Sequence, residues 1–138
     1  MSAPWAVEDV FVWAFSKNDD YAGYHFWATP KSAQEVGAIL SEYAHRIVAN
    51  ESCTLKLKPV TRRALRTVNC SSAVRCSFEK LRLKKDTATN FAESGGDLSV
   101  TVAREDLDIL LEALQAMSDG ISDFDALDGR VWFWVDPR

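Results

Sequence analysis

The side chains best suited to acid–base, nucleophilic or metal chemistry near neutral pH are two histidines and three cysteines. His25 lies in an apolar stretch and His45 beside charged residues, and neither has a recognisable catalytic partner nearby in sequence. Cys53, Cys70 and Cys76 form no CxxC pair and lack histidines at zinc-finger spacing. We therefore assign no catalytic residue and no cofactor, and expect reduced structural thiols. A small enzyme in which a cysteine meets a histidine stays open as the second alternative.

A group of aspartates near the C-terminus suggests a hard-cation site, because such ions take closely spaced carboxylate oxygens. Its members are Asp119, Asp123, Asp125 and Asp128. An EF-hand loop starting at Asp123 would need glycine at position 128 and glutamate at position 134, which are Asp128 and Trp134. We therefore predict no metal here. The aspartates either cap and solvate a loop or form an acidic docking surface for a basic protein partner.

Charge is laid out unevenly along the chain. Residues 54–86 carry ten basic and two acidic residues, a net of +8, although the whole chain has a net charge of −4. Residues 1–53 hold three basic and seven acidic residues, and residues 87–138 hold three and eleven. If folding leaves these segments on different faces, the protein has a basic pole and an acidic pole, which affect partners and association rates.

The basic segment offers an alternative function as a nucleic-acid-associated surface. Its candidate residues are Arg62, Arg63, Arg66, Lys80, Arg82, Lys84 and Lys85. Lys80, Arg82 and Lys84 would project from one face of a strand, with Phe78 at the same parity as a stacking ring. Against this interpretation stand a pI near 5.1 and the acidic third of the chain, which repels phosphates. Basic residues on outer strands also prevent edge pairing without binding anything.

Composition predicts one domain spanning residues 1–138. A chain of 138 residues, 47% hydrophobic with five Trp, has enough apolar material to fold alone. No signal-like start, Walker pattern or dinucleotide-binding glycine pattern occurs, and no run of about 18 apolar residues suggests a membrane span. We expect a soluble cytoplasmic protein without a membrane partner.

Hydrophobic periodicity predicts the elements of the first half. Residues 8–15 and 24–28 have the pattern of paired strands, the first apolar on both faces. Thr29-Pro30 can begin a helix with an apolar stripe that ends near Asn50, and residues 54–58 alternate as a strand. Residues 59–69 are ambiguous and include a possible short helix, whereas residues 73–85 resemble one long strand.

The second half is predicted as a polar loop at 86–97, a strand at 98–102, a helix, an acidic loop at 119–129 and a doubly apolar strand at 131–135. The helix has leucines at helical spacing from Leu107 and a natural stop at Gly120. These elements predict an α+β fold, a mainly antiparallel or mixed sheet of about five or six strands packed with two α-helices.

Two of the predicted strands are apolar on both faces, which raises the question of what covers the second face of the sheet. Self-association or a docked partner would bury it, and so would a helix on each face of the sheet, or the segment 59–69 if it folded over that face. Segregated charge, abundant aromatics and the lack of a catalytic set lead us to expect a non-catalytic protein-binding module. Small inhibitors of the immunity type, which cover a toxin, are an analogy in kind, and a homo-oligomer is compatible with each alternative.

Overall fold

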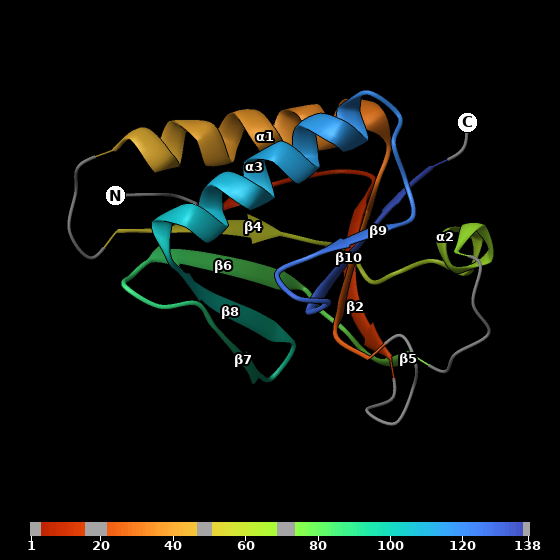
Figure 1. The fold of residues 1–138 in the computed structure, drawn as a ribbon. Helices are drawn as coiled ribbons and strands as arrows, with labels where there is room; N and C mark the ends of the chain where they lie inside the picture. The colour runs from red at the N-terminus through yellow and green to blue at the C-terminus, as the bar shows by residue number, and fades with distance from the viewer. Residues whose placement is uncertain (1–3, 16–21, 47–50, 69–73, 137–138) are drawn as a thin grey trace.

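The computed structural model describes residues 4–15, 22–46, 51–68 and 74–136, and Cys70, Asn50 and residues 16–20, where we expect a turn between the first two predicted strands, lie outside them. The strands are β1 (Trp5–Ala6), β2 (Val10–Phe15), β3 (Tyr24–Ala28), β4 (Ser52–Lys56), β5 (Val74–Ser77), β6 (Lys80–Lys85), β7 (Asn90–Ser94), β8 (Asp97–Val102), β9 (Phe124–Ala126) and β10 (Val131–Val135). The helices are α1 (Pro30–His45), α2 (Arg62–Thr67) and α3 (Arg104–Ser118) (Figure 1).

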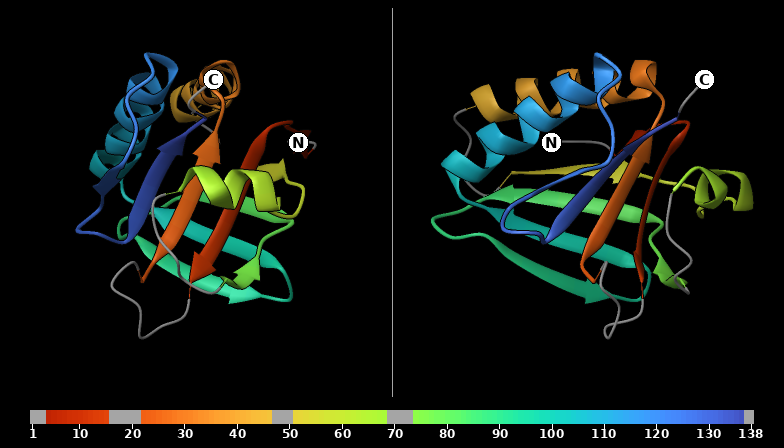
Figure 2. Two further views of the ribbon diagram at one scale, coloured as in Figure 1. Left: turned by 90° about the vertical axis from the view of Figure 1, so that its right-hand side faces the viewer. Right: turned by 45° about the vertical axis from the view of Figure 1, so that its right-hand side comes forward.

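The strands divide between two mixed sheets of five strands each. Sheet A has the order β1-β4-β6-β8-β7 and sheet B the order β5-β2-β3-β10-β9. The strands of the two sheets cross at a steep angle, and the two long helices lie together along one side of the pair (Figure 2). The predicted α+β class is confirmed, with two sheets in place of a single one and with a third, short helix.

The second sheet arises because the chain changes sheets where the sequence pattern suggests one continuous strand. At residue 78 the backbone leaves sheet B, where the Phe78 amide donates to the Val12 carbonyl at 2.9 Å. The next amide, of Glu79, already donates to the Gly96 carbonyl at 2.8 Å in sheet A. Phe78 therefore points into the core and is 1% exposed, so its predicted place in the basic row as a stacking ring is wrong.

Helices α1 and α3 run side by side in opposite directions and close the core shared by the two sheets (Figure 1). Thr29 caps α1 as predicted, its hydroxyl accepting from the Ser32 amide at 3.1 Å. Helix α3 ends at the predicted glycine: Gly120 has φ +87°, and its amide and that of Ile121 donate to carbonyls of the last turn. Helix α1 ends at His45, earlier than its apolar stripe suggested.

The aromatic outer face of sheet B is covered by α2. This face carries Phe11, Phe15, Trp13, His25, Trp27 and Trp134, all buried. Ala64 of α2 packs on it, and the Trp27 indole N–H donates to the Thr67 hydroxyl at 2.8 Å. The structure thus takes the intramolecular solution left open by the sequence, and these aromatics give no argument for a dimer or a docked partner. Among the described aromatic residues Trp5 is exposed, at 43%.

Candidate functional site

The predicted acidic site residues lie together in the connection from α3 to β10. Asp119 is the C-cap of α3, Asp125 lies in β9, and Asp123 and Asp128 occupy left-handed backbone positions on either side of that strand. All four are exposed. Helix α3, which leads into this connection, adds three further exposed carboxylates, those of Glu105, Asp108 and Glu112. We call these seven residues the acidic surface.

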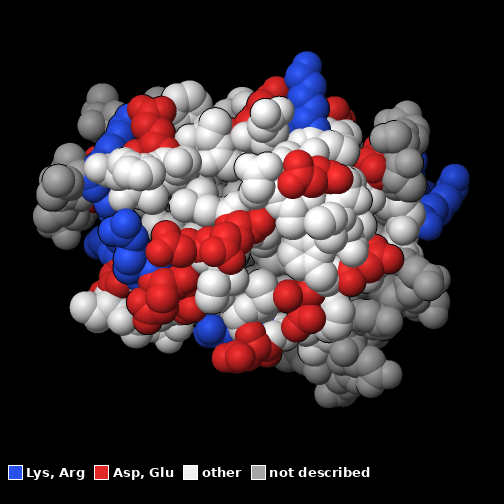
Figure 3. Space-filling model, turned by 45° about the horizontal axis from the view of Figure 1, so that its top comes forward, with Lys and Arg blue, Asp and Glu red and all other residues white. Residues whose placement is uncertain are grey.

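Figure 3 shows acidic side chains spread across the face that carries the long helices, with basic ones mainly toward its margins. Residues 103–130 contain eight acidic residues against Arg104 and Arg130. The Arg104 guanidinium lies 3.8 Å from Asp108, but both side chains are more than half exposed, so this pair neutralises little of the field. The acidic surface thus projects a negative potential.

Two exposed isoleucines lie within the same stretch of chain. Ile109 on α3 is 39% exposed and Ile121, just after the helix, is 55% exposed. Besides Trp5, these are the large hydrophobic residues exposed among the described parts of the chain. These two aliphatic side chains add apolar surface to the otherwise acidic stretch.

The acidic surface does not form a metal site in the described residues. No group of three or more His, Cys, Asp or Glu among them is arranged to hold a metal ion. Asp119 and Asp123 instead stabilise backbone turns: Asp119 donates its amide to the carbonyls of the last helical turn, and the Asp123 carboxylate accepts from the Ser122 hydroxyl at 2.8 Å.

The predicted basic residues separate into two groups on different layers. Lys80, Arg82 and Lys84 alternate along β6 away from the core, where the strand register sets Lys80 opposite Lys56 of β4. Of the three helices in the described part of the chain, none packs on that outer face of sheet A (Figure 2). Among the described residues none of these four cations forms an ion pair. These four cations lie on one face of sheet A, with Asp97 of β8 in register beside Lys80, and we call them the sheet A basic face.

The three arginines belong to the other layer. Arg62, Arg63 and Arg66 lie on α2 over sheet B, and Arg63 pairs at 2.9 Å with the buried carboxylate of Asp136. The structure therefore does not join them with Lys80, Arg82 and Lys84 into one basic surface.

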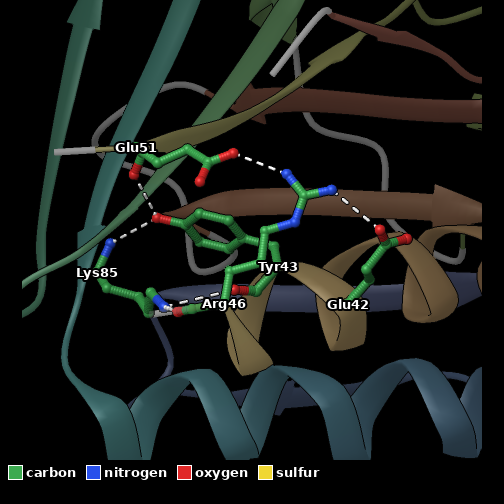
Figure 4. Close-up of polar contacts among 5 residues, drawn as sticks. All are labelled: Glu42, Tyr43, Arg46, Glu51 and Lys85. Atoms are coloured by element: carbon green, nitrogen blue, oxygen red, sulfur yellow. Dashed lines mark hydrogen bonds and ion pairs between the residues drawn. The ribbon is translucent and has the colours of Figure 1, made fainter. Parts of the chain in front are cut away.

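Lys85 serves neither group, because it is bound at the C-terminus of α1 (Figure 4). Its ammonium donates to the carbonyls of Arg46 and Tyr43, and its amide donates to the Tyr43 hydroxyl at 3.0 Å. Arg46 also bridges Glu42 and Glu51. Lys85 thus adds a donor to the Tyr43 carbonyl, which also accepts from the Arg46 amide at 3.1 Å, and the contacts fasten the end of α1 to sheet A.

The histidines and described cysteines occupy unrelated surroundings. His25 is 0% exposed, stacked on Trp13 at 5.4 Å between ring centres, and its Nδ1 accepts from the Trp134 indole N–H at 3.0 Å. His45 lies at the end of α1 and contacts the Ser41 carbonyl. Cys53 is buried in β4, and burial raises its pKa to about 11, which disfavours the thiolate nucleophile.

One electrostatic cluster was not predicted from the sequence. Glu93 on β7 accepts both arms of the Arg75 guanidinium at 2.8 Å and the Tyr24 hydroxyl at 2.8 Å. These bonds lower the pKa of Glu93 to about 2, mainly through Arg75. The pKa of Tyr24 is raised to about 12, mainly by burial of its hydroxyl and to a smaller extent by the hydrogen bond to Glu93. Because Arg75 lies in β5, the cluster joins an edge strand of sheet B to an edge strand of sheet A.

Comparison with known proteins adds no relative: no family model, curated protein or solved structure matches this chain significantly. In the part of the chain that the structure describes, no helix has the length and apolar character needed to cross a membrane.

Proposed function

We propose that this protein is a small, non-catalytic protein-binding module that docks a basic partner on its acidic surface, in the manner of an inhibitor or immunity-type protein. The observation that carries the proposal is the gathering of seven exposed carboxylates with two exposed isoleucines along α3 and the connection that follows it. The buried or mutually separate positions of the described histidines and cysteines favour binding over catalysis.

The two kinds of residue have separate roles in this proposal. Carboxylates steer a basic partner by long-range attraction, which raises the association rate and weakens with salt. Ile109 and Ile121 supply the apolar contact that slows dissociation once the surfaces meet. The proposal therefore predicts that charge changes alter mainly the association rate and that isoleucine truncations alter mainly the dissociation rate.

The test compares two double charge reversals of equal size. Glu112→Lys with Asp125→Lys removes charge from the acidic surface, whereas Glu8→Lys with Glu79→Lys changes exposed residues outside it. Partners captured from native lysate with and without nuclease would be identified and their association rates measured at low and high salt. We expect at least a tenfold slower association for the first variant at low salt only. Equal rates for both variants and the unmodified chain would refute the proposal.

A second candidate function is polyanion binding by the sheet A basic face. The observation that favours it is the cross-strand pairing of Lys56 with Lys80, since like charges directly opposite each other destabilise a strand pair. An anionic ligand would relieve that repulsion. The absence of an exposed aromatic side chain from β4 and β6 favours phosphate contacts over base stacking.

A short DNA duplex is the probe for this second function. Four phosphate contacts predict that log K falls with log salt with a slope of roughly −3 to −4. Lys80→Glu with Lys84→Glu should abolish binding, and the matched variant Arg62→Glu with Arg66→Glu on α2 should retain it. No binding at low salt, or loss in the α2 variant alone, would contradict the assignment to sheet A.

A further inference from the structure

An apolar cavity of about 60 Å³ lies in the core between the two sheets. Residues of sheet A, sheet B and both long helices form its walls, among them Leu83, Val100, Leu114 and Phe133. Only apolar atoms are exposed inside it. The volume would accommodate a few water molecules, but a water molecule there would lack hydrogen-bond partners, so the cavity favours an apolar occupant over water.

Side chains close the cavity at one edge of the sandwich. Strand β7 is an edge of sheet A and β9 an edge of sheet B, and the two are not paired with each other. Phe91 of β7 is partly exposed and lines the cavity, so its ring separates the interior from solvent. Its ring stacks on Tyr24 with ring centres 5.1 Å apart, and the Arg130 guanidinium lies 5.4 Å from its centre.

Leu127 lines the same cavity from the turn between β9 and β10. Its carbonyl accepts from Arg130 Nε at 2.9 Å, so Arg130 contacts both Leu127 and Phe91. Leu127 has φ +55° and Asp128 φ +58°, and a left-handed backbone is strained for a residue as large as leucine. The surroundings hold this strained turn so that the Leu127 side chain, 6% exposed, points into the core.

We propose that this cavity is a binding site for a small apolar molecule, which enters by displacing Phe91 and Leu127. In the closed form the space suits an occupant no larger than a xenon atom. With the phenyl ring of Phe91 turned outward, the space extends to a single aromatic ring or the end of a short alkyl chain. The proposal does not rest on the acidic surface, although the closing residue Leu127 adjoins Asp128 of that surface, because the atoms exposed inside the cavity are all apolar.

The test uses xenon and benzene as probes, with methyl resonances of the intact protein as the readout. Saturable shifts confined to the methyls that line the cavity, among them those of Leu83, Val100 and Leu114, are expected with xenon. Phe91→Ala should bind benzene at least fivefold more tightly than the unmodified chain, because it removes the closing ring. Val100→Leu, which fills part of the cavity, should weaken xenon binding at least fivefold.

Two results would overturn the proposal. One is the lack of any saturable shift in both the unmodified chain and Phe91→Ala. The other is a set of shifts spread over surface methyls, which would indicate nonspecific uptake. Ala92→Gly, at an exposed neighbouring position of β7, controls for a general loosening of that strand and should leave benzene binding unchanged. Denaturant unfolding of each variant verifies that it is folded before the probes are added.

Discussion

Replacement of Glu93 by glutamine should make the stability of this protein less dependent on acid pH. Folding lowers the pKa of this carboxyl from 4.5 to about 2, because Arg75 and Tyr24 donate hydrogen bonds to its charged form. A group whose pKa is lowered by folding stabilises the native state above its unfolded pKa and loses that contribution as pH falls. The contribution of Glu93 is therefore complete above about pH 5 and declines toward pH 2.

The magnitude follows from the change in pKa. At about 1.36 kcal/mol per pH unit, the lowering from 4.5 to about 2 sets an upper limit of roughly 3.4 kcal/mol. The side chains of Glu93 and Arg75 are 30% and 31% exposed, so solvent and salt screen the pair. We expect Glu93→Gln to lower the free energy of unfolding by about 1–2 kcal/mol at pH 7.

Denaturant unfolding at pH 7, 5, 3 and 2 measures this difference. The gap between the unmodified chain and Glu93→Gln should narrow steadily below about pH 5. Glu112→Gln, at an exposed position without an ion pair to a described residue, serves as the matched control and should change stability by less than about 0.5 kcal/mol. A gap that stays constant with pH, or is absent at pH 7, would refute the assignment of acid sensitivity to Glu93.

Three further predictions concern the fold. Gly23→Ala should lower the free energy of unfolding by about 1–3 kcal/mol in a thermal or denaturant melt, because Gly23 has φ +116° and an added Cβ would lie 2.9 Å from a backbone carbonyl oxygen. Unchanged stability would contradict this backbone geometry. In the same assay, Leu107→Ala should lower the free energy of unfolding by about 3–5 kcal/mol and Ile109→Ala by about 0.5 kcal/mol or less, because Leu107 is 0% exposed and Ile109 is 39% exposed. Equal losses would contradict the orientation of helix α3. Nitrogen NMR at neutral pH should show His25 with its proton on Nε2, because Nδ1 accepts from Trp134; a protonated Nδ1 would exclude that bond.

The long helices could be predicted because their determinants are local. Helix α3 has apolar residues at helical spacing, acidic residues in its first turn and Gly120 at its end, and each feature appears in the structure. Thr29 likewise caps α1. The end of α1 was placed too late because a helix stops where tertiary contacts stop it. Here Lys85 binds the carbonyls of Tyr43 and of the C-cap residue Arg46.

The division into two sheets could not be predicted, since it depends on contacts between segments distant in sequence. A strand that passes from one sheet to the other keeps its extended backbone. The only sign of the change at Phe78 in the sequence is a break in the alternation of apolar and polar residues. Strands β7 and β9 were missed for a related reason. Both are edge strands with largely exposed residues, and such strands lack the apolar alternation by which a strand is identified.

The candidate surfaces differ in predictability in the same way. The aspartates at 119–128 could be identified because they are close together in sequence, so any fold that exposes the connection after α3 gathers them, whereas the carboxylates of α3 were not predicted as part of the site. The basic residues lie on helix α2, which packs on sheet B, and on strand β6 of sheet A. Their separation into two surfaces is set by the topology of the sheets. Glu93 gave no sequence signal, because Arg75 and Tyr24 reach it only when the edges of two sheets meet.

Tyr24 connects that charged cluster to the closure of the cavity. Its hydroxyl donates to Glu93, and its ring stacks on Phe91, so one side chain of β3 contacts two residues of β7. Here sheets A and B approach without backbone pairing, so side-chain contacts must hold the edges together. The charged bonds to Glu93 are the strong and directional ones, whereas the Tyr24–Phe91 stack and the Arg130 contact are weaker. The bonds to Glu93 therefore hold this edge most firmly, and a rotation of the Phe91 ring would leave them intact.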